Sequence, residues 1–125
     1  MTTVYSTAEV VIPDDYPQPT GYRILIVMPK VEEKTKGGVL LPNDTLNKED
    51  VASIVGKVVK VGLNAYPTSD PRFGTTPWCK DGDWVMISKY SGHRFECDGI
   101  EMRIVNDDAI IAVVNDPTKI ARAHA

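Results

Sequence analysis

The sequence has few cysteines and no long hydrophobic run. Its two cysteines, Cys79 and Cys97, lie far apart and form no Cys-x-x-Cys motif. We therefore expect two reduced thiols in a cytoplasmic protein, with a disulfide as the less favoured alternative. No apolar run approaches the roughly 18 residues that a membrane-spanning helix needs, and residues 1–6 lack the basic start and apolar stretch of a signal peptide. We expect neither a membrane protein nor a secreted disulfide-rich one.

The chain also lacks an excess of basic residues. Its formal net charge is -3 at pH 7, and its pI is near 5.3. A nucleic-acid-binding surface needs a basic face, so we expect no nucleic-acid partner. With 125 residues, of which 42% are hydrophobic and 25% charged, the composition is that of one globular domain large enough to bury a core.

Catalytic and metal-binding patterns are missing as well. The two histidines, His93 and His124, have no set of three or four potential ligands at zinc-site spacing around them. The carboxylate pair Asp107 and Asp108 fits a turn, in which Asp side chains bind nearby backbone groups. No glycine-rich phosphate loop follows an expected strand. We expect no enzyme activity, no cofactor and no metal site.

What the sequence does have is a series of short strand patterns separated by turn signals. Gly56, inside the second of these runs, suggests a bulge or a bend. Asp98-Gly99, between two runs of alternating polarity, is a strong signal for a two-residue hairpin. Short strands at this spacing are typical of a small all-β barrel or sandwich. The expected strands are residues 22–28, 51–62, 84–87, 94–97, 100–104 and 109–114.

Three other segments frame or interrupt the expected barrel of residues 22–114. The leader, residues 1–21, is rich in proline but carries more apolar residues than a solvated tail needs. We expect it to pack as an extended arm on its own barrel or a neighbouring one. Residues 63–78 are expected to form an extended loop pinned by aromatic side chains, and residues 115–125 a short polar tail.

The most informative local feature is an apolar triplet at residues 39–41, in the middle of the polar residues 31–50. A pair of glycines at residues 37–38 precedes it, and glycine pairs let a backbone swing because neither residue has a Cβ. Three bulky apolar side chains exposed together cost solubility unless a partner covers them. The local sequence alone leaves open a second interpretation, a buried edge strand after a Gly-Gly turn.

Six short motifs follow one another along the chain. They are the charged residues 31–36, Gly-Gly-Val-Leu-Leu at 37–41, Gly-x-Val-x-x-Val-Gly at 56–62, Lys-Asp-Gly-Asp-Trp-Val at 80–85, Ser-Lys-Tyr-Ser-Gly at 88–92 and Asp-Ala-Ile-Ile-Ala-Val-Val at 108–114. Each motif alone is weak. Their order over residues 22–114 resembles that of the GroES-type co-chaperonins, the chaperonin-10 family, which are heptameric lids of chaperonin cages.

The resemblance implies a small, irregular, Greek-key-like β-barrel with a long mobile loop at about residues 31–50 and an extended N-terminal arm. It also implies a homo-oligomer, a heptamer, that caps a GroEL-type chaperonin ring in its ATP-bound state and assists ATP-dependent protein folding. The implied chaperonin-binding residues are Gly37, Gly38, Val39, Leu40 and Leu41. In the family, terminal strands pair between subunits, which implies the interface residues Tyr22, Ile24, Ile26, Ile110, Ala112 and Val114.

Departures from the family pattern leave alternatives open. Residues 63–78 are rich in proline and stand in place of the family's roof hairpin. Together with the leader and the tail, they resemble elaborations of bacteriophage-encoded co-chaperonins, which act in the host cytoplasm. For a lid, deleting residues 1–18 is expected to leave chaperonin binding nearly unchanged. One alternative is a virion structural protein that decorates a capsid and reuses the barrel. The other is a ligand-binding barrel that uses Tyr66, Trp78, Trp84 and Tyr90.

Overall fold

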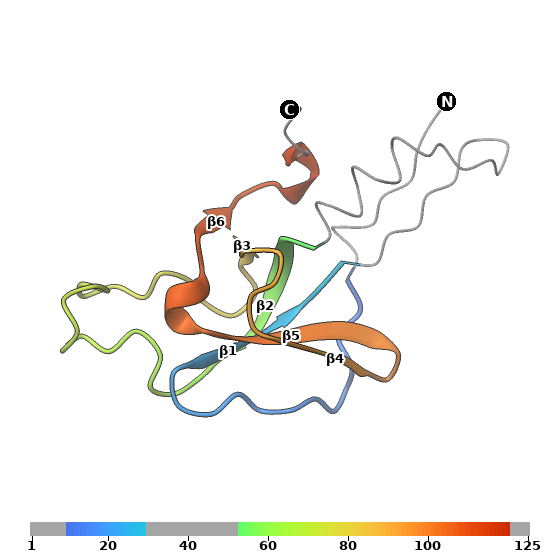
Figure 1. Cartoon of the computed structure of the whole chain (residues 1–125), viewed down its shortest axis with the longest axis horizontal. Coiled ribbons are helices and arrows are strands. Elements are labelled where there is room, and N and C mark those ends of the chain that lie inside the picture. The colour runs from blue at the N-terminus through green and yellow to red at the C-terminus, as the bar shows by residue number, and fades with distance from the viewer. Residues whose placement is uncertain (1–9, 30–52, 121–125) are drawn as a thin grey trace, which may run out of the picture.

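The computed structural model of the protein describes residues 10–29 and 53–120, which build one antiparallel sheet of six strands (Figure 1). The strands lie side by side in the order β4-β5-β1-β2-β3-β6. Two 3-10 helices, η1 (Asp107–Ala109) and η2 (Pro117–Lys119), are the only helical turns in this part of the chain. The strands are β1 (Arg23–Val27), β2 (Val55–Val61), β3 (Trp84–Met86), β4 (His93–Cys97), β5 (Ile100–Asn106) and β6 (Ala112–Val114).

β1 lies in the middle of the sheet and is buried on both faces. It pairs with β2 along one edge and with β5 along the other. Residues 24–27 have no exposed surface. Because successive side chains of a strand point to opposite faces, Ile24 and Ile26 enter one apolar cluster and Leu25 and Val27 another. The prediction of a strand buried on both faces is confirmed.

The larger apolar cluster, which we call the first core, is enclosed by the sheet and by residues 63–79. Tyr66, Phe73 and Cys79 of that segment pack against the side chains of β1, β2, β3 and β5. Residues 63–79 contain no strand, so they cover the sheet as a folded loop. The full set of buried residues is Ile24, Ile26, Met28, Val58, Tyr66, Phe73, Cys79, Val85, Ile87, Val105 and Ile110.

The opposite face of the sheet holds a smaller cluster, the second core. Its fully buried members are Leu25, Val27 and Met102, with half-buried apolar side chains of β2, β4 and β5 around them. Val10 and Tyr16, from the segment that precedes β1, pack against this cluster. The described part of the N-terminal arm therefore packs on its own sheet.

Gly56 allows a close approach between β1 and β2. A Cβ at this position would overlap with Cγ2 of Ile26 and would come within 3.1 Å of the Val27 carbonyl oxygen. The bulge that the sequence suggests at Gly56 lies elsewhere: Leu25 pairs with Lys60 and Ile26 with Val58, so the register shifts in the interval that contains Val59. The glycine is needed for interstrand packing rather than for the bulge.

The hairpin of β4 and β5 forms where the sequence predicts it. Cys97 pairs with Ile100, so the loop consists of Asp98 and Gly99 alone. Both residues have positive φ angles, 52° and 77°. A two-residue turn of type I′ requires positive φ at both positions, which Asp and Gly tolerate better than most residues.

The all-β prediction is confirmed, and the antiparallel sheet is consistent with a GroES-type small β fold. In the described residues the sheet is open, with β4 and β6 at its edges. The last strand is shorter than the predicted 109–114, because η1 turns the chain first. The backbone N–H of Asp107 donates to the Tyr22 carbonyl, and the Tyr66 hydroxyl donates to the Asp107 carbonyl, so these groups are engaged outside the sheet.

Candidate interaction surface

The predicted chaperonin-binding residues, Gly37, Gly38, Val39, Leu40 and Leu41, lie outside the described residues. The structure does describe the two points from which that segment departs. The N–H of Met28 donates to the Glu101 carbonyl at 3.0 Å, and the N–H of Ile87 donates to the Ile54 carbonyl at 2.8 Å. Since β1 and β2 are antiparallel neighbours, both points lie at the same end of the sheet.

Residues 63–78 leave β2 at its other end. Figure 1 shows them in yellow-green on the left, away from the ends of β1 and β2 near residues 29 and 53. The segment predicted to bind a chaperonin and residues 63–78 therefore start from opposite ends of the β1–β2 pair.

The predicted subunit-interface residues fall into two groups. Ile24 and Ile26 are fully buried in the first core, Ile110 is almost fully buried there, and Val114 of β6 is almost fully buried as well. β1 also has both of its edges paired within this chain. Tyr22 and Ala112 are exposed. Of the predicted set, these last two residues have side chains that another subunit can reach.

β6 forms one edge of the sheet. It pairs with β3 on one side, and its other side faces away from the described sheet. Ile111 and Val113 are 61% and 45% exposed beside it. An apolar edge strand with free backbone groups invites pairing with another chain. We call Ile111, Ala112 and Val113 the β6 edge, and it is the best candidate surface for self-association in the described structure.

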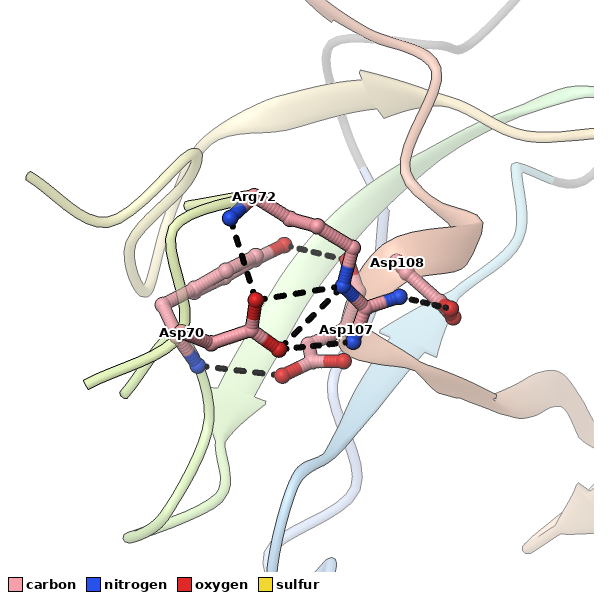
Figure 2. A network of polar contacts seen from close by, with 5 residues as sticks. Asp70, Arg72, Asp107 and Asp108 are labelled. Atoms are coloured by element: carbon pink, nitrogen blue, oxygen red, sulfur yellow. Dashed lines mark hydrogen bonds and ion pairs between the residues drawn. The ribbon is translucent and has the colours of Figure 1, made fainter. Parts of the chain in front are cut away.

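Residues 63–78 are tied to η1, just before the β6 edge, by a network of polar contacts (Figure 2). The backbone N–H of Tyr66 donates to Oδ2 of Asp107 at 3.0 Å, and its hydroxyl donates to the Asp107 carbonyl at 2.9 Å. Burial raises the pKa of the Tyr66 hydroxyl well above its ordinary value, and the neighbouring Cys79 thiol adds to the rise. The hydroxyl therefore stays protonated and remains a donor. We call these two bonds the Tyr66 clamp.

Arg72 adds an exposed ionic contact to the same junction. Its guanidinium donates to the Asp70 carboxylate, with Nη2 2.9 Å from Oδ2, and to Asp108, with Nη1 3.2 Å from Oδ2 (Figure 2). These hydrogen bonds lower the pKa of Asp70. The sequence shows Asp107 and Asp108 as turn residues, but nothing local shows that their partners are Tyr66 and Arg72. That pairing is a structural contact beside the β6 edge that sequence reasoning missed.

The remaining chemistry of the described residues is limited. Among them, no group of three or more His, Cys, Asp or Glu side chains is placed to hold a metal ion, and no helix is long and apolar enough to cross a membrane. Cys79 and Cys97 are free thiols.

Tyr66 and Trp78 pack against Phe73, with ring centroids 5.1 Å and 4.9 Å from it. Two of the four aromatic residues that the ligand-barrel alternative would use, Tyr66 and Trp78, therefore pack within residues 63–78.

Several known proteins are similar to this chain over most of its length. A family model described as "Chaperonin 10 Kd subunit" matches residues 17–114. The co-chaperonin GroES of Natranaerobius thermophilus is 38% identical over 97 residues, which cover 78% of this chain and 96% of the relative. That of Caldicellulosiruptor saccharolyticus is 33% identical over 99 residues, covering 79% and 97%. That of Bacillus sp. strain PS3 is 36% identical over 97 residues, covering 78% and 97%.

The match begins in the arm and ends with β6, so it spans every strand of the sheet. It also spans residues 31–50, in which the apolar triplet lies. Members of this family are chaperone components rather than enzymes. The chain belongs to the chaperonin 10 kDa subunit family, the GroES-type co-chaperonins.

Proposed function

We propose that this protein is a co-chaperonin that caps a GroEL-type chaperonin ring in its ATP-bound state and assists ATP-dependent protein folding in the cytoplasm. Residues 31–50 form the contact, through Gly37, Gly38, Val39, Leu40 and Leu41. The observation that carries the proposal is the family match over residues 17–114, which includes this segment. A separate alignment with one co-chaperonin GroES covers 96% of that relative.

The energetics of the apolar triplet fit a reversible cap. Burying Val39, Leu40 and Leu41 in a partner's groove contributes about 1.5–3 kcal/mol per side chain, or roughly 5–8 kcal/mol in all. Ordering about ten residues of backbone costs about 1–2 kcal/mol each. A single segment therefore binds weakly or not at all. Several segments on one ring bind by avidity, because each later contact is intramolecular.

Avidity requires an oligomer, and we propose a ring of identical subunits, a heptamer. The β6 edge and the exposed Tyr22 offer the surface for it. Ile24, Ile26 and Ile110 support this surface from within the first core, and Val114 is buried in β6 itself, so these side chains do not contact a neighbour. Pairing of the β6 edge with a second chain would also remove an exposed apolar edge strand.

The test is binding of the purified full-length protein to a GroEL-type chaperonin in the presence of ATP. We expect co-elution with the chaperonin and a reduced ATPase rate. Leu40→Asp should abolish both while the oligomer keeps its size, because it places a charge in the apolar contact. Leu63→Asp is the matched control: Leu63 is 96% exposed, and it lies at the opposite end of β2.

Two results would contradict the proposal. Unchanged affinity of Leu40→Asp would show that residues 39–41 are not the contact. A wild-type protein without affinity for any chaperonin, but present in virus particles, would instead support the capsid-decorating alternative. Oligomerisation has its own readout: a native monomer at micromolar concentration in light scattering would contradict the ring.

A further inference from the structure

Arg103 is a buried cation that uses only part of its hydrogen-bonding capacity. It lies on β5 opposite Ile26 of β1, and it has no exposed surface. Its Nη1 donates to the carbonyl of Lys89 at 2.6 Å, and the carbonyl of Ser91 is 3.5 Å away. Nε and Nη2 are also buried, and they meet no hydrogen-bond acceptor in the part of the chain that the structure describes. A buried donor without a partner is costly, and more so when it is charged, so one edge of the guanidinium is left unsatisfied.

The turn that Arg103 holds presents an exposed aromatic side chain. The two carbonyls near Nη1 flank Tyr90, which is 83% exposed. At the end of the turn, Gly92 packs so closely on β5 that a Cβ there would come within 2.5 Å of the Ile104 carbonyl oxygen. The guanidinium and this close contact together fix the position of residues 88–92 against β5.

Like charges face each other across the β4–β5 hairpin. Arg94 of β4 lies opposite Arg103, and Glu96 of β4 lies opposite Glu101 of β5. Like charges directly opposite each other in a sheet are destabilising. Burial and the charge of Arg94 lower the pKa of Arg103, although an arginine keeps its proton in proteins. Both arginines therefore gain from a carboxylate, and Glu101 is close to both of them.

Glu101 lies between the two arginines and is bound to the outer one. Its Oε1 accepts a hydrogen bond from Nη2 of Arg94 at 3.1 Å. Its Oε2 is 4.0 Å from Nε of Arg103, close enough for an ion pair but too far for a hydrogen bond. A movement of about 1 Å would bring Oε2 into the hydrogen-bond range of about 2.7–3.2 Å. The Glu101 side chain is 39% exposed, so packing does not fix it in its present position.

We propose that Glu101 is a two-position carboxylate that binds either Arg94 or the Nε–Nη2 edge of Arg103. In the outer position, which the structure shows, the buried edge stays open. In the inner position Glu101 fills that edge, because Nε and Nη2 present their N–H bonds as a fork that matches a carboxylate. The inner position holds Arg103, and with it the turn that carries Tyr90, more firmly. The exchange involves no chaperonin, so it can be tested whether or not the proposed function holds.

The difference in solvent access between the two arginines determines what shifts the exchange. The Arg94 side chain is 58% exposed and that of Arg103 is fully buried. Salt screens an exposed ion pair much more than a buried one. The outer position should therefore lose occupancy as the ionic strength rises, and the inner position should gain it.

The first experiment measures Tm of full-length variants at one protein concentration. Arg94→Met removes the outer partner, so Glu101 turns to Arg103. We expect Tm to rise by about 3–6 °C, because a weak exposed pair is exchanged for a hydrogen bond to a buried charge. The matched controls are the same substitution in the Glu101→Gln and Arg103→Met backgrounds, which lack the carboxylate and the fork. In neither background should Arg94→Met raise Tm.

A second measurement needs no change at Arg103. The difference in Tm between Arg94→Met and wild type is measured at low and at high NaCl concentration. It should shrink as NaCl is raised, because salt releases Glu101 from Arg94 in the wild type, whereas in the variant Glu101 is already in the inner position.

Three results would overturn the exchange. They are a Tm of Arg94→Met at or below that of wild type at low salt, a rise of equal size in the Glu101→Gln background, and a Tm difference that stays constant or grows with salt. A crystal structure of Arg94→Met gives a direct readout. An oxygen of Glu101 should lie within hydrogen-bond distance of Nε or Nη2 of Arg103, and a carboxylate that points into solvent instead would contradict the proposal.

Discussion

The two faces of the central sheet are closed in different ways. The first core is covered by residues 63–79, which lie within the family match. Its buried residues come from four strands, from that loop, and from Met28, Ile87 and Ile110 next to the strands. The second core is smaller, and Val10 and Tyr16 cover part of it. Both of these residues precede residue 17, where the family match begins. The loop over the first core therefore lies within the range of the family match, whereas part of the cover of the second core precedes that range.

This difference predicts where the fold tolerates change. A core enclosed by sheet and loop cannot lose a side chain without leaving a cavity, because its neighbours are held on all sides. A core covered by an extended segment can be opened by removing that segment. The two faces meet in β1, where consecutive residues point to different cores, so neighbouring substitutions can compare them.

The largest effect is expected in the first core. Ile26→Ala should lower the free energy of unfolding by about 3–5 kcal/mol, because Ile26 is fully buried and also packs against the backbone at Gly56. The measurement is urea unfolding followed by Trp fluorescence, with Leu25→Ala as the adjacent substitution in the second core. A smaller loss for Ile26→Ala than for Leu25→Ala would reverse the comparison.

The second largest effect is expected from the arm. Deleting residues 1–18 removes Val10 and Tyr16 and should cost about 2–4 kcal/mol of unfolding free energy, since two partly buried side chains are lost. It also removes the Asp15 carbonyl that accepts from the Cys97 thiol at 3.2 Å. The sequence predicts that the arm is dispensable for chaperonin binding, and that prediction stays open. The structure adds that the arm is needed for stability.

Deleting residues 1–9 is the matched control for the arm, because it leaves Val10 and Tyr16 in place. A double-mutant cycle sharpens the result. In the background that lacks residues 1–18, Leu25→Ala should cost much less than in the full chain, whereas Ile26→Ala should cost the same. Equal costs in both backgrounds for both substitutions would show that the arm does not close the second core.

A smaller effect is expected at the Tyr66 clamp. Tyr66→Phe keeps the ring packed against Phe73 but removes the hydroxyl that donates to the Asp107 carbonyl. The loss should be about 1 kcal/mol, the usual net value of one hydrogen bond. Tyr90→Phe, at an exposed tyrosine, is the control and should change nothing measurable. A thermal unfolding scan of both variants at one pH is sufficient.

The smallest effect concerns pH. The pKa of Asp70 is lowered by its hydrogen bonds with Arg72, so the folded state binds the proton less readily than the unfolded chain. This contribution to stability is present above the ordinary pKa of 3.8 and is lost as the pH falls through the lowered value. Between pH 7 and pH 3, Asp70→Asn should therefore lose slightly less Tm than wild type. Asp14→Asn, at an exposed carboxylate in the arm, should follow the wild type.

Part of the fold follows from local sequence. The β-branched run before Pro29 is enough to predict a strand buried on both faces, and Asp98-Gly99 is enough to predict the hairpin. The apolar run at residues 109–114 predicts strand character, but not its shortening. That depends on Asp107, whose partners Tyr22 and Tyr66 lie far from it along the chain. The same distance explains why the Tyr66 clamp could not be predicted.

The sequence by itself determined the presence and order of the strands, the turn chemistry and the family, because each depends on the order of neighbouring residues. Tertiary structure decided which face each apolar residue enters, why position 56 must be glycine, and which arginine is buried. Such properties depend on residues that folding brings together from distant parts of the chain. The contact of Cys97 with Asp15, 82 positions apart, is another example. A local pattern contains the propensity of each segment, and only the folded chain sets its partners.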